Sequence, residues 1–198
     1  AFAVWDGEKL FLCRDRFGVK PLYYFINNGD IFFASEIKSI IHYNNLNEIT
    51  VNGLKEVLGL GPSHSSGDGI FKGVRELKPS HYGYVNGTLN TTKYFELKVK
   101  KHTDNFDETA QKTKQLFVDA VKRQLVSDVP LCTFLSGGVD SSAITAIAIG
   151  QKKNFASYSI DYENNDKAFK KNSFQVSSDK DYIKFMTDAF ELNHTCKE

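Results

Sequence analysis

Short apolar and aromatic runs, separated by turn residues, dominate the first hundred residues of the chain. Two of these runs flank Asn28-Gly29, the dipeptide most typical of a tight hairpin. Ser35 precedes isoleucines that recur at helical spacing, which indicates a capped short helix through Ile41. The pattern predicts a β-meander, two short helices and further strands. The predicted strands are residues 1–5, 10–14, 22–26, 31–34, 71–76, 82–85 and 94–99, and the second helix is residues 53–58.

A helical period replaces this pattern after residue 104. Asn105 and Glu108 have the spacing of a capping box, which marks the start of a helix. The long amphipathic helix that follows opens a second domain. Its apolar positions are Phe106, Ala110, Phe117, Val121 and Leu125.

Strand-like and helix-like segments then alternate. We predict a strand at 129–135, a helix to about residue 150, a strand at 155–162, a polar loop from residue 163 and a helix at 179–190. Residues 191–198 show no closing element. The β-α-β order predicts a parallel, doubly wound sheet, whose ligands bind beyond the carboxyl ends of the strands.

Residues 136–142 read Ser-Gly-Gly-Val-Asp-Ser-Ser, between a predicted strand and a predicted helix. Glycines let the backbone approach an anion, and the free N–H groups and dipole of a helix's first turn favour negative charge. Ser136, Ser141 and Ser142 add hydroxyl donors. The Asp140 carboxylate would repel phosphates unless a divalent cation lay between them, and Mg²⁺ accepts oxygen ligands from both. The loop therefore predicts a site for a magnesium nucleotide.

The loop is not the common P-loop, because no Gly-x-x-x-x-Gly-Lys-Ser/Thr run occurs in the chain. It resembles the pyrophosphate loop of the ATP pyrophosphatases, which release pyrophosphate and pass through an adenylated intermediate. The alternative is a plain Ser/Gly turn between strand and helix. Seven specified positions in a strand-turn-helix context favour the nucleotide site.

Composition narrows the class of protein. The chain has 198 residues, 41% hydrophobic and 25% charged, which is typical of a globular protein. The net charge of +1 gives no field for nucleic acid or a membrane surface. The chain has neither an apolar stretch of membrane-spanning length nor a secretion signal at its N-terminus. Its three cysteines lack metal-ligand spacing. We therefore expect a cytoplasmic protein whose partners are small molecules, with no nucleic acid and no membrane.

Three further blocks accompany the loop. Residues 14–24 read Arg-Asp-Arg-Phe-Gly-Val-Lys-Pro-Leu-Tyr-Tyr, residues 33–38 read Phe-Ala-Ser-Glu-Ile-Lys, and residues 73–79 read Gly-Val-Arg-Glu-Leu-Lys-Pro. Ser127-Asp128-Val129-Pro130 leads into the loop itself. In this order the blocks resemble the family of glutamine-hydrolysing asparagine synthetases. Because residue 1 lies inside a strand-like run, we expect the chain to be a piece of a longer protein.

The resemblance implies a fold and an activity. The fold is part of an α+β N-terminal nucleophile-type αββα sandwich, followed by part of an α/β doubly wound parallel-sheet ATP-pyrophosphatase domain. Residues 1–103 would be the C-terminal part of a class II glutamine amidotransferase domain, and residues 104–198 the N-terminal part of the synthetase domain. The activity is an ATP-dependent, glutamine-hydrolysing conversion of aspartate to asparagine through β-aspartyl-AMP, with release of AMP and pyrophosphate. The implied ligands are ATP, Mg²⁺, aspartate and glutamine, and a homodimer is left open.

The resemblance also implies site residues, position by position. It gives no catalytic residue, because the family's glutaminase nucleophile is an N-terminal cysteine and residue 1 here is Ala1. In the family pattern the glutamine-binding segments precede residue 1, and the aspartate segments follow residue 198. Asp140 would contact the metal through magnesium pyrophosphate. For Leu135 and Ile160 the alternative role is packing in the core. The implied ATP and pyrophosphate residues are Leu135, Ser136, Gly137, Gly138, Val139, Asp140, Ser141, Ser142 and Ile160.

Two other functions stay open. A related adenylating, amide-forming enzyme, such as a β-lactam synthetase or a lasso-peptide cyclase, would keep the loop and use another acceptor. A non-catalytic remnant would bind a nucleotide and do no chemistry.

Overall fold

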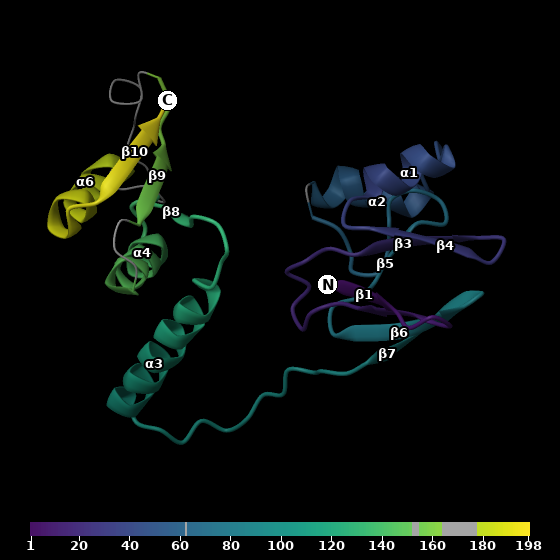
Figure 1. Ribbon diagram of the computed structural model, residues 1–198, viewed down its shortest axis with the longest axis horizontal. Coiled ribbons are helices and arrows are strands. Elements are labelled where there is room, and N and C mark those ends of the chain that lie inside the picture. Colours follow the sequence, from purple (N-terminus) through teal and green to yellow (C-terminus); the bar gives the residue numbers. More distant parts are fainter. Residues whose placement is uncertain (62, 152–154, 164–177) are drawn as a thin grey trace. The chain divides into compact units, whose positions relative to one another are not determined.

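The computed structural model describes residues 1–61, 63–151, 155–163 and 178–198 (Figure 1). Most of the polar loop predicted from residue 163 lies outside these residues. The chain is a mixed α/β protein that divides into two compact units, Ala1–Lys101 and His102–Glu198. None of the helices in the described ranges combines the length and the apolar character needed to cross a bilayer.

Two antiparallel sheets form the framework of the first unit, with strand orders β1-β2-β6-β7 and β4-β3-β5. The first sheet contains β1 (Phe2–Trp5), β2 (Leu10–Cys13), β6 (His81–Asn86) and β7 (Thr88–Lys93). The second contains β3 (Tyr23–Asn27), β4 (Asp30–Ala34) and β5 (Arg75–Glu76).

The core of the first unit lies between these two sheets. Leu12 of β2 and Tyr24 of β3 meet there, together with Leu22 and Leu77. Helices α1 (Ile37–Asn44) and α2 (Val51–Leu60) lie along the opposite side of the second sheet (Figure 1). Phe32 of β4 contacts Tyr43 of α1 on that side, with ring centroids 5.4 Å apart. The described part of the unit is therefore a stack of a helical layer and two sheets.

The hairpin predicted at Asn28-Gly29 is confirmed. Both residues have positive φ, 50° and 90°, as a two-residue type I′ turn requires, and Asn27 pairs with Asp30 across it. The predicted cap at Ser35 is wrong, because α1 begins one residue later behind Glu36 and has no side-chain cap bond. The strand predicted at 94–99 is also wrong. The β6–β7 hairpin pairs the polar residues of β7 instead, and that strand ends at Lys93.

The second unit opens with helix α3 (Phe106–Gln124), and its predicted capping box is confirmed. Asn105 Oδ1 accepts the Glu108 N–H at 2.9 Å, and Glu108 Oε2 accepts the Asn105 N–H at 3.1 Å. The remaining elements are β8 (Cys132–Phe134), α4 (Val139–Gln151), β9 (Ala156–Ile160), α6 (Asp179–Phe190) and β10 (Asn193–Lys197).

These strands form a parallel sheet of order β10-β9-β8, so the parallel pairing expected from the β-α-β order is confirmed. Strand β10 corrects the expectation that residues 191–198 contain no closing element. Its residues are mostly polar and show no apolar alternation. The strand exists because Asn193 to Lys197 pair in register with Ala156 to Ile160 of β9.

Helices α4 and α6 cover the same face of this sheet. Thr133, Ser157 and His194 form one row across the three strands on that face. Thr145 of α4 donates a hydrogen bond to Thr133 at 3.0 Å, and α6 lies beside His194. The chain passes from β8 to β9 and then to β10, which is the same direction across the sheet each time. Right-handed crossovers made in the same direction place both helices on the same face. The other face carries Phe134 and Ile160, which are 72% and 71% exposed. Helices on both faces, as in a doubly wound sheet, stay a prediction.

Candidate functional site

The loop of residues 136–142 begins where β8 ends. Leu135 is 1% exposed, and its N–H donates to the Tyr158 carbonyl of β9 at 2.8 Å, which is the last link to the sheet. Helix α4 begins only four residues later, at Val139. The loop therefore lies at the carboxyl end of a parallel strand, where open α/β sheets bind their ligands.

The backbone of the loop requires glycine at position 137. Gly137 has a φ of +78°, in the left-handed region that other residues avoid. A Cβ there would also come within 2.7 Å of the carbonyl oxygen of Asp179, the first residue of α6. At Gly138, by comparison, a Cβ would meet nothing closer than Ser136 Oγ, at 3.5 Å. The start of α6 thus packs directly against the loop, a contact that no sequence motif indicated.

The first turn of α4 presents free N–H groups. The helix ladder starts with Ser142, whose N–H donates to the Gly138 carbonyl at 3.0 Å. Within the described residues, the N–H groups of Val139, Asp140 and Ser141 have no acceptor, and glycine at the preceding position provides no capping side chain. These groups and the helix dipole together favour an anion at this point.

Hydrogen bonds among its own serines hold the loop in shape. Ser141 Oγ lies 3.2 Å from the Ser136 nitrogen and 3.0 Å from Ser136 Oγ, and it donates to the Gly138 carbonyl at 3.1 Å. Ser142 lies one position further along the helix, and its hydroxyl makes no such bond within the described residues. The two adjacent serines of the motif therefore have different surroundings.

Asp140 extends an exposed carboxylate from the first turn of α4. This carboxylate has no hydrogen-bond or ion-pair partner among the residues that the structure describes. Within the described ranges, no group of three His, Cys, Asp or Glu side chains comes together to hold a metal. Mg²⁺ is commonly bound by one or two carboxylates together with substrate phosphates. A single free carboxylate beside an anion site fits that arrangement.

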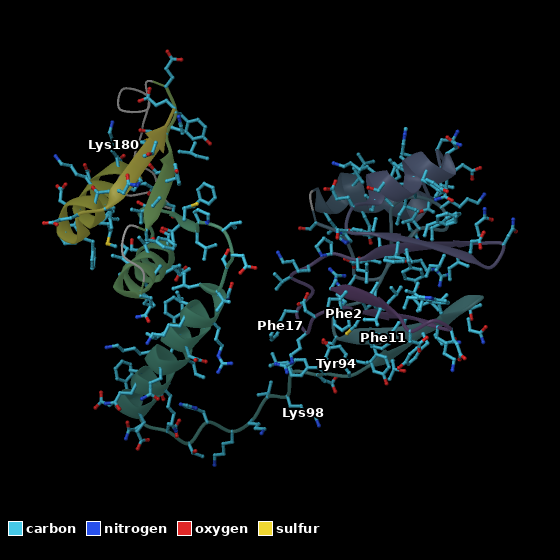
Figure 2. All side chains as sticks on the ribbon, viewed as in Figure 1. Phe2, Phe11, Phe17, Tyr94, Lys98 and Lys180 are labelled. Atoms are coloured by element: carbon cyan, nitrogen blue, oxygen red, sulfur yellow. The ribbon has the colours of Figure 1, made fainter. Side chains whose placement is uncertain are left out.

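A cavity of about 390 Å³ lies between α6 and the carboxyl ends of β9 and β10. Ile160, Tyr162 and His194 contribute to its wall, and Lys180 of the first turn of α6 (Figure 2) lines it as well. No residue of the loop 136–142 lines this cavity, so it is not the anion site itself. The two features adjoin through Asp179, which lines the cavity and packs against Gly137. Ile160 is thus exposed at the edge of this cavity.

His194 is held from both sides in the wall of this cavity. Its Nδ1 lies 2.9 Å from Ser157 Oγ, and its Nε2 lies 3.0 Å from Ser159 Oγ. Burial lowers the pKa of the His194 ring, which favours the neutral form. No motif in the sequence pointed to His194. The alternation of Ser157 and Ser159 on one face of β9 was the signal that could have located this cluster.

Comparisons with known proteins match both halves of the chain. Residues 1–95 match the sequence model of the glutamine amidotransferase domain, and residues 112–197 match that of asparagine synthase. The two matches follow each other in the order of the two structural units.

Similar proteins occur in bacteria, archaea and fungi. The chain is 49% identical to glutamine-hydrolysing asparagine synthetase 3 of Bacillus subtilis, over 98% of this chain and 33% of that protein. It is 30% identical to a putative glutamine-hydrolysing asparagine synthetase 2 of Methanocaldococcus jannaschii, over 98% of this chain and 37% of that protein. It is 32% identical to amidase chyE of Penicillium rubens, over 74% of this chain and 22% of that protein. The chain thus spans about a third of the length of the B. subtilis relative, and by both matched domains and this likeness it belongs to the family of glutamine-hydrolysing asparagine synthetases.

Proposed function

We propose that the whole protein is a cytoplasmic ligase that makes asparagine from aspartate, with ATP as the energy source and glutamine as the nitrogen donor. The observation that carries this proposal is the start of α4, where the N–H groups and the Asp140 carboxylate have no partner among the described residues, in a chain that matches both domain models. On this proposal, the second unit carries a phosphate-binding loop, and the first unit is part of a glutamine amidotransferase domain.

The proposed chemistry explains why the site must bind a nucleotide. A carboxylate is a poor electrophile, because neither oxygen is a leaving group. When the β-carboxylate of aspartate attacks the α-phosphorus of ATP, a new P–O bond forms, the α–β phosphoanhydride breaks and pyrophosphate leaves. Ammonia from glutamine then attacks the acyl carbon of β-aspartyl-AMP, and AMP leaves with the former carboxylate oxygen. Donors fixed around the departing pyrophosphate would stabilise the charge that it gains.

We assign the nucleotide site to the residues that the family pattern indicates. The free N–H groups of Val139, Asp140 and Ser141 would receive the pyrophosphate, and glycine at 137 and 138 lets it approach the backbone. Leu135 is buried, so its contact with the nucleotide would come from its backbone. Ile160 is exposed beside the cavity and would contact the adenine. The full proposed set is Leu135, Ser136, Gly137, Gly138, Val139, Asp140, Ser141, Ser142 and Ile160.

Asp140 would hold Mg²⁺ together with phosphate oxygens. The metal would supply positive charge that neutralises the pyrophosphate. The chain's own part is to fix the carboxylate in the first helical turn, where it points into solvent beside the N–H groups. Without the metal, this carboxylate would repel the anion that the N–H groups attract.

The finer description of the fold is also a proposal. We propose that residues 1–103 belong to an N-terminal nucleophile-type αββα sandwich, and that residues 104–198 open a doubly wound ATP-pyrophosphatase domain. The helical layer and two sheets of the first unit support the sandwich. A fourth layer would cover the aromatic outer face of the first sheet, where Phe2 and Phe11 lie (Figure 2).

The test is the Asp140→Asn substitution in the full-length protein. We expect aspartate-dependent pyrophosphate release to fall by at least about 100-fold, because the variant loses the charge that holds the metal at the departing group. Glutamine hydrolysis, measured as glutamate formation, should persist because it occurs at another site. Asp188→Asn, which makes the same change at an exposed position on α6, is the matched control and should leave both rates unchanged.

Other outcomes would change the assignment. Pyrophosphate release that is undiminished in Asp140→Asn would reject the site. The second candidate is a related amide-forming enzyme with an acceptor other than aspartate, which would use the same loop. ATP-dependent pyrophosphate release that requires another carboxylate in place of aspartate would support it. Binding of ATP by the wild-type protein without any product would indicate a nucleotide-binding remnant.

A further inference from the structure

The hydroxyl of Ser141 is the most fully bonded side-chain group in the loop. A serine hydroxyl has one proton to donate and two lone pairs to accept with. The proton of Ser141 goes to the Gly138 carbonyl, at 3.1 Å. Its oxygen lies within reach of both the N–H and the O–H of Ser136, at 3.2 and 3.0 Å. With these three bonds formed, Ser141 has no proton left for a phosphate oxygen.

The same bonds also engage Ser136. Because the Ser141 proton is donated to Gly138, the proton in the Ser136–Ser141 contact must come from Ser136. The hydroxyls of Ser136 and Ser141 are therefore both turned inward. Of the three serines in the motif, Ser142 alone keeps a hydroxyl with no bond among the described residues.

The three bonds join the two ends of the loop. Ser136 is its first residue, and Ser141 lies in the first turn of α4. Gly138 is the residue just before the helix, and its carbonyl accepts from both Ser141 Oγ and the Ser142 N–H. The bonds turn that carbonyl into the helix, away from the side that presents the free N–H groups. A carbonyl oxygen on that side would repel an anion.

We infer that Ser141 is a positioning residue, which braces the loop so that its backbone N–H groups and the Ser142 hydroxyl bind the pyrophosphate. The inference rests on the proposed function and refines it, because it gives Ser141 a positioning role and Ser142 a role in binding the pyrophosphate. The close contact of Gly137 with Asp179 holds the loop from outside, and Ser141 holds it from within.

The test compares Ser141→Ala with Ser142→Ala in the full-length protein. One readout is amide hydrogen exchange of the peptide that contains Ser136, measured without ligand. The other is the affinity for inorganic pyrophosphate in the presence of Mg²⁺. For Ser141→Ala we expect exchange to accelerate about fivefold and pyrophosphate to bind about tenfold more weakly, as loss of a hydrogen-bonded brace implies. For Ser142→Ala we expect weaker pyrophosphate binding with unchanged exchange.

A third variant keeps the test decisive if the alanine variant folds poorly. Ser141→Thr retains the hydroxyl, and a helical threonine readily bonds the carbonyl three or four residues earlier. It should keep both amide protection and pyrophosphate affinity within about twofold of wild type. Weaker binding in Ser141→Ala with no change in exchange would overturn the inference, because Ser141 would then be a direct ligand. Unchanged binding and exchange would overturn it too.

The two proposals fail in different ways. If the wild-type protein does not bind magnesium pyrophosphate, the proposed function fails. The exchange measurement needs no ligand, so it still decides whether Ser141 braces the loop.

Discussion

Two charged side chains of the block at residues 14–20, those of Arg14 and Asp15, are bonded mainly to backbone groups. Arg14 is buried, pairs with Glu76 at 2.6 Å and donates to the Leu77 carbonyl at 2.7 Å. Asp15 accepts the N–H groups of Phe17, Val19 and Lys20. Burial would raise the pKa of the Asp15 carboxyl, but these donors outweigh it and lower the pKa to about 2. Arg14 also donates to the Gly18 and Lys20 carbonyls, so both charges hold the turn at residues 15–20 in shape.

At the same scale, the two glycines of the loop should differ sharply in their tolerance of a methyl group. Gly137→Ala puts a side chain on a residue with φ of +78° and drives its Cβ against the Asp179 carbonyl. We expect this variant to lose pyrophosphate binding and about 1–3 kcal/mol of stability. Gly138→Ala is the matched control, because its Cβ would find ordinary contact distance.

The measurement is denaturant unfolding of the full-length variants alongside their affinity for magnesium pyrophosphate. The Gly138 variant should unfold close to wild type. Equal stability of the two alanine variants would show that the contact between Gly137 and α6 is absent in solution.

At the scale of elements, His194 fixes β10 against β9 through a polar contact rather than an apolar one. Ser157 and Ser159 are both buried, and each hydrogen-bonds one nitrogen of the ring. The row formed by Thr133, Ser157 and His194 continues across the sheet to β8. A buried polar row of this kind specifies register, because a shift by one residue would leave its groups unpaired.

This arrangement predicts a pH dependence. Burial lowers the pKa of His194, so as the pH falls the unfolded chain takes up a proton, near 6.5, before the folded chain does. The folded state then binds fewer protons, and the free energy of unfolding falls as the pH drops through this range. The slope is at most about 1.4 kcal/mol per pH unit for one proton, and water near the ring reduces it.

Denaturant unfolding between pH 8 and pH 5 measures this effect. His194→Gln should flatten the dependence, whereas His42→Gln, at an exposed histidine of α1, should leave it as in wild type. A His194→Gln protein whose stability follows the wild-type pH curve would contradict the prediction.

Elements with local signals were predictable from the sequence, and elements that depend on a distant partner were not. The capping box at Asn105 and the turn at Asn28-Gly29 each lie within a few residues, and both are confirmed. Strand β10 has no pattern of its own and forms only because β9 offers a free edge. The strand predicted at 71–76 is shorter in the structure and contains only Arg75–Glu76, the two residues that pair with β3.

The candidate site divides in the same way. The anion site at the loop was predictable because its seven residues are contiguous in the sequence and their chemistry favours an anion. The contact of Gly137 with Asp179 and the hydrogen bonds of Ser141 depend on backbone geometry, which residue types alone do not determine.

At the scale of the whole molecule, an irregular segment between β7 and α3 joins the two compact units of the chain. Residues 94–105 contain no helix or strand, and the two compact units divide at Lys101 and His102. Lys98, which leads out of β7 (Figure 2), is exposed, and so are Lys100 and Lys101. A segment with exposed side chains and without backbone ladder bonds opens easily into the extended form that proteases bind.

Trypsin should therefore cut at these lysines before it cuts at any other lysine or arginine of the described residues. Limited proteolysis followed by mass spectrometry should give fragments that end at Lys98, Lys100 or Lys101. Replacement of all three by glutamine should remove those fragments and leave the folded units intact, because the side chains are exposed and support no core. A first cut at Lys112 or Arg123 would mean that α3 opens more readily than the segment before it. That result would argue against a domain boundary near residues 103 and 104. The cut position thus tests the boundary on physical grounds, independently of any likeness to other proteins.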